Sequence, residues 1–156
     1  MMGQVWATVR HRWAQVPVWA RWVLAVYMIG FAEGTGDHVA WMTHGGIHAY
    51  AQFGAVLIQV FFVALIIFDP LVVVLAGLVR REAVYLAVAV MALDLTANWT
   101  ASWPRVPWTF IVDGVFVFAT AVPLLRVMPG GSGVLWRAAD SRHKPAGSQT
   151  RSLDEV

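Results

Sequence analysis

Four acidic residues lie in the middle of apolar stretches: Glu33, Asp69, Asp94 and Asp113. A carboxylate at the centre of a membrane helix costs roughly 2.5–3.5 kcal/mol on insertion scales. Carboxylic acids kept in a dry site can accept and donate protons near neutral pH. We therefore expect these side chains to face a common interior, with Glu33, Asp94 and Asp113 as candidate catalytic residues.

The four acidic positions fall at similar heights along the helices that would carry them. Counted at about 1.5 Å per residue from the nearest arginine, they lie roughly 16 to 20 Å deep. Apart from Arg21 at the cytoplasmic edge of the first stretch, no lysine or arginine occurs in these apolar stretches. The carboxyl groups must then be protonated, hydrogen-bonded, hydrated or paired with a cation.

Further polar residues lie about one helical turn outward. Asp37 follows Glu33 by four residues and Asn98 follows Asp94 by four, so each pair shares a helix face. The pattern predicts a polar funnel that opens to the outside and ends at the carboxylates. The candidate ligand-binding residues are Asp37, His48, Asp69, Asn98 and Trp99.

Each of these features also has a simpler interpretation. Asp94 and Asn98 could only hydrogen-bond other helices, Asp69-Pro70 could mark a helix break, and Asp113-Gly114 a packing notch. His44 and His48 have a spacing found in metal sites, but this spacing is common by chance and no H-E-x-x-H motif is present. We predict no metal and no cofactor.

The elements that must position these residues are membrane helices. Hydrophobic residues make up 59% of the chain and charged residues 13%, which is too apolar for a soluble domain. A span needs roughly 20 apolar residues. We predict an all-α protein with a bundle of four transmembrane helices, at about 18–37, 56–79, 83–99 and 108–125.

The second predicted span leaves two possibilities open. Our preferred one is a single helix over 56–79, kinked at Pro70, with residues 47–55 extending it above the membrane. The alternative ends the span at Phe68 and lays 70–79 along the cytoplasmic interface, because proline breaks or kinks helices. Residues 38–48 are expected to form a short polar outer segment.

Three regions follow from this pattern. Residues 1–17 alternate tryptophan with arginine, which predicts an amphipathic segment at the membrane interface. Residues 18–127 form the four-helix transmembrane domain. Residues 128–156 are rich in Gly, Ser and Arg and predict a disordered cytoplasmic tail.

The basic residues set the predicted orientation. The chain has ten arginines and one lysine, and all except Arg105 fall on one side of the four-span arrangement. That side is cytoplasmic by the positive-inside rule, which puts both termini in the cytoplasm of a multi-pass cell-membrane protein. The excess of arginine is typical of a GC-rich bacterial genome.

The remaining composition excludes several classes of function. The chain has no cysteine, which excludes disulfides, thiol catalysis and cysteine-bound metals. Its net charge of +2 is small, and the basic residues lie at the membrane edges, so nucleic acid is not an expected partner. The expected partners are the lipid bilayer and a lipophilic ligand or another membrane protein.

Some residues carry a loose resemblance to a known family. They are Arg21, Gly30, Asp69, the hairpin of Gly77-Leu78 and Arg80, and the stretch from Ala83 to Asp94. The layout resembles small four-span bacterial membrane proteins of the DoxX-like kind and, more distantly, EXPERA sterol-isomerase and sigma-2-like proteins. That pattern would have a basic residue near Glu33, which this chain lacks, so the resemblance implies architecture only.

Three functions fit the sequence. The first is a pocket of buried carboxylates that binds a lipophilic small molecule or transforms it by acid–base chemistry. The second is an accessory subunit of a larger membrane complex. The third is a proton- or cation-coupled carrier of small molecules, since carboxylates near the membrane centre and broken helices are typical of transporters.

Overall fold

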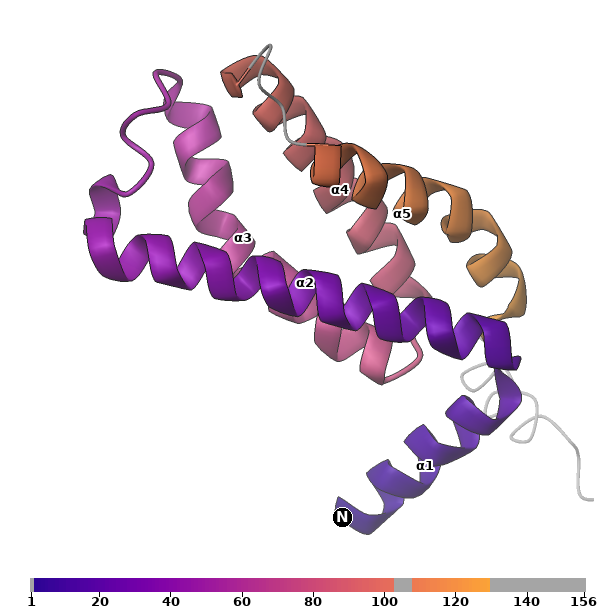
Figure 1. Ribbon diagram of the computed structural model, residues 1–156. Helices are drawn as coiled ribbons and strands as arrows, with labels where there is room; N and C mark the ends of the chain where they lie inside the picture. Colours follow the sequence, from indigo (N-terminus) through magenta and orange to yellow (C-terminus); the bar gives the residue numbers. More distant parts are fainter. Residues whose placement is uncertain (1, 103–107, 130–156) are drawn as a thin grey trace, which may run out of the picture.

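The computed structural model describes residues 2–102 and 108–129, and the regular secondary structure in these ranges is all helical. The elements in order are α1 (Met2–Gln15), α2 (Val18–Gly45), the short 3-10 turn η1 (Gly46–His48), α3 (Val56–Gly77), α4 (Arg81–Ser102) and α5 (Trp108–Val127) (Figure 1). The predicted all-α class is confirmed. Arg105 and the part of the predicted tail from 130 to 156 lie outside the described residues.

The helix α2 is longer than the sequence predicted. It begins after Pro17, whose backbone is extended, and ends at Gly45 rather than at 37. The predicted outer segment 38–48 is therefore helical as far as Gly45, and neither glycine nor proline occurs between residues 38 and 44. The helix ends where Gly46 adopts a φ of 58°, a conformation that glycine takes without steric cost.

The helix α3 runs through Pro70 without interruption. This outcome supports the single-helix interpretation and rules out a helix end at Phe68. We had expected residues 47–55 to extend α3. They instead form most of η1 and a series of turns. The break falls at Gly54 and Ala55, where the backbone of Ala55 is extended just before α3 begins.

The helices α2 to α5 pack in chain order, and α2 also contacts α5 (Figure 1). The Tyr27 hydroxyl joins these two helices: it donates to the Val117 carbonyl at 2.9 Å and lies 3.0 Å from the Thr120 hydroxyl. Next to this contact the side chains of Leu24 and Leu124 are fully buried. The α2–α5 contact is therefore tight at this end of the bundle.

Arginines gather at that same end, which we call the arginine end. It holds the last part of α1, the start of α2, the α3–α4 turn and the end of α5, with Arg10, Arg12, Arg21, Arg80, Arg81 and Arg126. Hydrogen bonds tie these segments together. Arg81 donates to the Met128 carbonyl at 2.9 Å, and Arg12 donates to the Leu78 carbonyl at 3.4 Å.

Within the part of the chain that the structure describes, three helices are long and apolar enough to cross a membrane: α3, α4 over Arg81–Thr100, and α5. Their outer faces carry large exposed apolar side chains, such as Leu57, which is 81% exposed, and Ile67, which is 68% exposed. The longer α2, which contains Arg21, Glu33 and Asp37, is not in this group.

Candidate functional site

A cavity of about 810 Å³ lies between α2, α3, α4 and α5. Six polar residues that the sequence singled out line it together: Glu33, Asp37, Asp69, Asp94, Asn98 and Asp113. The helices bring these side chains to one space although the chain separates the first from the last by 80 positions. The roles assigned to them stay predictions.

The cavity occupies the half of the bundle away from the arginine end. Its lining begins at Val26 on α2 and ends at Val117 on α5, whereas Leu24 and Leu124 beyond these points are completely buried. The cavity is therefore closed at the arginine end. Its exposed lining residues include Glu33 and Asp37 on α2 and Asp113 on α5, so it is open on the side where these residues lie.

The carboxylates differ in their exposure along this cavity. Glu33 and Asp37 on α2 and Asp113 on α5 are exposed and form its rim, while Asp69 on α3 is only 4% exposed. Asp94 on α4 is half-buried. The acidic groups thus extend from the open side to the floor of the cavity.

Asp69 is the deepest of these groups and has little direct compensation. The Nε2 atom of His38 lies 4.0 Å from the Oδ2 atom of Asp69, beyond hydrogen-bond distance. No described residue donates a hydrogen bond to this carboxylate. A Cβ atom on Gly34 would lie 2.9 Å from Oδ2, so glycine at position 34 leaves the space that the carboxylate occupies.

His38 and Tyr50 belong to this site, and our sequence analysis missed both. The Tyr50 hydroxyl lies 2.7 Å from His38 Nδ1, and both side chains line the cavity. His38 follows Gly34 by four residues on the same helix face, a signal we overlooked because we expected α2 to end at 37. Tyr50 lies in the turns after η1, where no periodicity indicates a facing direction.

The Tyr50 hydroxyl stays protonated well above neutral pH. Burial raises its pKa above the ordinary value, and the carboxylates of Asp37 and Asp69 act in the same direction. A protonated hydroxyl can donate to Nδ1 of a neutral His38, which puts the imidazole proton on Nε2. Tyr50, His38 and Asp69 then form a chain of polar groups from the turns to the cavity floor.

Asp94 and Asn98 interact within α4. The Asn98 amide donates to the Asp94 side chain at 3.1 Å and to the Asp94 carbonyl at 3.0 Å. The simpler interpretation, in which they bond to other helices, has no hydrogen bond to support it among the described residues. Because Asn98 is 9% exposed, this bond fixes Asp94 toward the cavity rather than joining two helices.

Gly114 and Asp113 have separate roles in the structure. A Cβ atom on Gly114 would collide with the side chain of Leu95, so α4 and α5 pack closely here. The packing-notch interpretation therefore fits Gly114. Asp113, one residue earlier, is exposed and lines the cavity.

His48 and Trp99 are not among the described residues that line the cavity, although the sequence suggested both as ligand-binding residues. His48 is exposed in η1, and Trp99 is exposed near the end of α4. His44 is also exposed and its Nδ1 lies 2.7 Å from the Ala40 carbonyl. Within residues 2–102 and 108–129, no three His, Asp or Glu side chains are placed to hold a metal ion.

Aromatic side chains provide much of the remaining wall. They are Tyr27, Phe31, Trp41, Tyr50, Phe53, Phe62, Trp108, Phe110 and Phe116. Tyr50 stacks on Phe62 with ring centres 5.3 Å apart. No lysine or arginine is among the described lining residues, so the cavity combines acidic groups with apolar rings.

Comparison with protein-family models, with curated proteins and with solved structures found no match.

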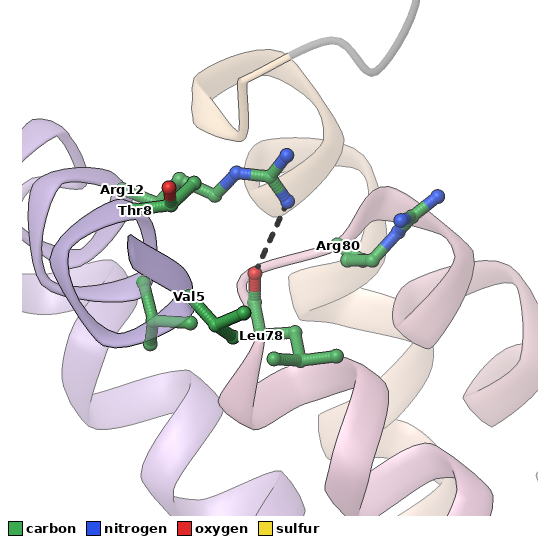
Figure 2. Close-up of a pocket in the computed structure, with 6 residues that line it drawn as sticks. Val5, Thr8, Arg12, Leu78 and Arg80 are labelled. Carbon is green, nitrogen blue, oxygen red and sulfur yellow. Dashed lines mark hydrogen bonds between the residues drawn. The ribbon is translucent and has the colours of Figure 1, made fainter. Parts of the chain in front are cut away.

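A second, smaller cavity of about 210 Å³ lies where α1 meets the α3–α4 turn (Figure 2). Arg12 points across it toward the Leu78 carbonyl, and Trp13 donates to the Gly77 carbonyl at 2.8 Å. These carbonyls close α3 and need such donors. Arg80 points away and pairs with Glu82 at 2.9 Å. This cavity marks the attachment of α1.

Proposed function

We propose that the chain is an integral membrane protein whose helices α2 to α5 all cross the bilayer. The exposed apolar side chains on α3 and α5, such as Leu57 and Val112, support this because soluble monomers rarely expose large contiguous apolar surfaces. For α2 the support is different. Its polar residues Glu33, Asp37 and His38 line the cavity, where water or a ligand inside the cavity can solvate them.

The proposed orientation puts the arginine end in the cytoplasm, with both termini there. The positive-inside rule supports it, because all the arginines in the described residues lie at that end. In this orientation α1 lies along the cytoplasmic face, where Trp6 is exposed to the interface. The cavity then opens between α2 and α5 toward the outer side.

We propose that this cavity binds a lipophilic small molecule. Ligand sites are usually concave, about 300–1,000 Å³ in volume and mostly apolar, with a few convergent polar groups. The observation that carries the proposal is the buried Asp69 carboxylate at the floor of a cavity of about 810 Å³. A packed membrane bundle has no reason to keep both an acidic group and a space of this size.

The same residues have the composition needed for acid–base chemistry on the bound molecule. Asp69 and Asp94 can accept or donate protons from the cavity floor, and Glu33 and Asp113 can do so from the rim. Tyr50 and His38 connect this floor to the turns after α2. A proton transfer within the bound molecule, such as an isomerisation, is the enzymatic activity that we propose for the site.

A proton- or cation-coupled carrier is our second candidate. The observation that favours it is a cavity with several carboxylates that is closed at the arginine end and has exposed acidic residues at its rim. Carriers expose their site to one side at a time. Flux into proteoliposomes with and without a pH gradient separates a carrier from a binding protein or an enzyme. A stable second subunit in mild detergent would instead indicate an accessory subunit.

The binding proposal is tested directly by a substitution whose side chain fills the cavity. A Cβ atom on Gly30 would have no neighbour within 4 Å, and Gly30 lines the cavity, so Gly30→Phe puts a ring into it. Ile29→Phe is the matched control, because Ile29 is 67% exposed on the outer surface. Native mass spectrometry in mild detergent measures the small molecules that remain bound to each variant.

The wild-type protein and Ile29→Phe are expected to retain a bound small molecule that Gly30→Phe loses. The same bound molecules in all three proteins would contradict the proposed pocket. Folding of each variant is checked by its thermal unfolding in detergent.

A further inference from the structure

The charge of the cavity lining points to the chemical class of its ligand. Five carboxylate side chains line this space, and the described lining contains no lysine or arginine. His38 is the only described lining residue that can carry a positive charge, and it lies 4.0 Å from Asp69. The protein therefore provides almost no positive charge of its own for these groups.

Resting on the proposed function, we infer that the ligand is a lipophilic organic cation, such as an amine or a quaternary onium ion with apolar substituents. Its charged centre lies at Asp69 and its apolar part lies among the aromatic rings. An ionised carboxylate in a low-dielectric site is stabilised strongly by a close opposite charge. A cationic ligand supplies that charge where the protein does not.

The burial and hydrogen bonding of Asp69 are an observation independent of the clustering of acidic residues. This side chain is 95% buried, lines the cavity and has no hydrogen bond donor among the described residues. Buried polar groups in folded proteins are nearly always hydrogen-bonded. Among the described residues no fully buried side-chain oxygen lacks a hydrogen bond, so the Asp69 oxygens reach the open space of the cavity. A ligand with a positive or N–H group would occupy these free acceptor sites.

The rings near Asp69 are suited to the same ligand. A cation within about 6 Å of an aromatic face is attracted by the negative charge of the ring face, and more strongly in a desolvated site. Phe62 and Tyr50 line the cavity and stack on each other, and His38 packs against both at ring-centre distances of 6.1 and 6.0 Å. Aromatic faces next to an acidic group form a site for an onium ion.

A metal ion fits the geometry less well than an organic cation. Metal ions require several ligand atoms at about 2.0–2.6 Å from one point. The described His, Asp and Glu side chains do not converge in that way, and they surround a space of about 810 Å³. Dispersed carboxylates around a large apolar cavity match a large ion of low charge density.

The test uses three probes of similar size and different charge: tetraphenylphosphonium, tetraphenylborate and neutral triphenylphosphine oxide. Equilibrium dialysis measures their binding to the full chain in lipid nanodiscs, and empty nanodiscs correct for partition into lipid. We expect saturable binding of the phosphonium ion, with at least tenfold weaker binding of the other two probes. Asp69→Asn should weaken phosphonium binding at least tenfold.

Glu82→Gln is the matched control, because it removes an exposed carboxylate at the arginine end, outside the cavity. It should leave the affinity for phosphonium unchanged. If Asp69→Asn does not fold, Glu33→Gln at the rim should weaken binding at least threefold. An unchanged affinity in these cavity variants would overturn the inference.

Other outcomes separate this inference from the proposed function. Equal or tighter binding of the neutral oxide would keep the lipophilic pocket and overturn the preference for a cation. Tighter binding of the borate would do the same. Absence of saturable binding by all three probes would overturn the inference and count against the pocket itself.

Discussion

Gly34 on α2 lies directly against the carboxylate of Asp69 on α3: a Cβ atom at position 34 would be 2.9 Å from Oδ2. This distance is well below an ordinary van der Waals contact, so a larger residue forces one of the two groups to move. The buried acid and the glycine opposite it are therefore one structural unit. Any account of the cavity has to explain why the chain makes room for that carboxylate.

The first prediction follows from this contact. Gly34→Ala should displace the Asp69 carboxylate and weaken phosphonium binding at least fivefold in nanodiscs. Gly30→Ala is the matched control, because it lies one turn earlier on the same helix, lines the same cavity and has no neighbour within 4 Å. Both substitutions replace a helical glycine and gain about 1 kcal/mol in helix propensity. An equal loss of binding in the two variants would contradict this role for Gly34.

The second prediction concerns the packing of α4 on α5. Gly114→Ala should lower the thermal unfolding temperature in detergent, since the new methyl group collides with Leu95 and overpacking costs about 1–3 kcal/mol. The double variant Gly114→Ala with Leu95→Ala should recover part of that loss. If the double variant lost more stability than the two single variants lose together, this contact would be ruled out as the cause.

The third prediction concerns the attachment of α1. Trp13→Phe keeps an aromatic ring but removes the hydrogen bond to the Gly77 carbonyl, and Arg12→Gln weakens the bond to Leu78. Together they should free α1 from the α3–α4 turn. Spin labels on Gln4→Cys and Tyr85→Cys report this by pulsed electron resonance, because the chain has no native cysteine.

The distance distribution between the two labels should be narrow in the otherwise native chain and broad in the Trp13→Phe, Arg12→Gln variant. A broad distribution in both proteins would show that these hydrogen bonds do not hold α1. The affinity for phosphonium should not change, since neither residue lines the large cavity.

The fourth prediction concerns alkaline pH and Tyr50. Its pKa is raised by burial, whereas in the unfolded chain it titrates near its ordinary value of about 10. The protonated hydroxyl therefore contributes stability that is fully present below about pH 10 and is lost as pH rises through the folded-state pKa. Tyr50→Phe should flatten the fall in unfolding temperature above pH 10.

Tyr85→Phe is the control for this titration, because Tyr85 is 61% exposed on α4. It should leave the alkaline fall in unfolding temperature as steep as in the wild-type protein. The account of Tyr50 would be wrong if Tyr50→Phe and Tyr85→Phe had the same pH profile from pH 8 to 11.

Much of the helical framework could be predicted from the sequence. Long apolar runs gave α3, α4 and α5 within a few residues of their ends, because hydropathy depends on composition alone. The first span was predicted to end at Asp37, with His38 as the start of an outer segment, whereas α2 continues to Gly45. In the structure both line a cavity, so polar residues within a helix were mistaken for a loop.

The cavity was predicted less completely than the helices. Counting residues from the arginines placed Glu33, Asp69, Asp94 and Asp113 at similar heights, and all four line one space. The height of a residue does not determine which way its side chain faces. His48 and Trp99 were predicted at this site, but neither is among the described lining residues. Tyr50 was missed because a residue in irregular turns has no helical face from which its direction can be predicted.

The most direct test of the central claim compares two neighbouring positions on α4 in proteoliposomes. Met91→Cys lies in the cavity lining, and Leu93→Cys is 57% exposed on the outer face at nearly the same height. Cationic and anionic water-soluble methanethiosulfonate reagents are added from the outside. If the helices enclose an acidic, outward-open cavity within the bilayer, Met91→Cys reacts, at least tenfold faster with the cationic reagent, while Leu93→Cys is protected by lipid. Equal reaction at both positions, no reaction at Met91→Cys, or a faster anionic reagent would contradict it.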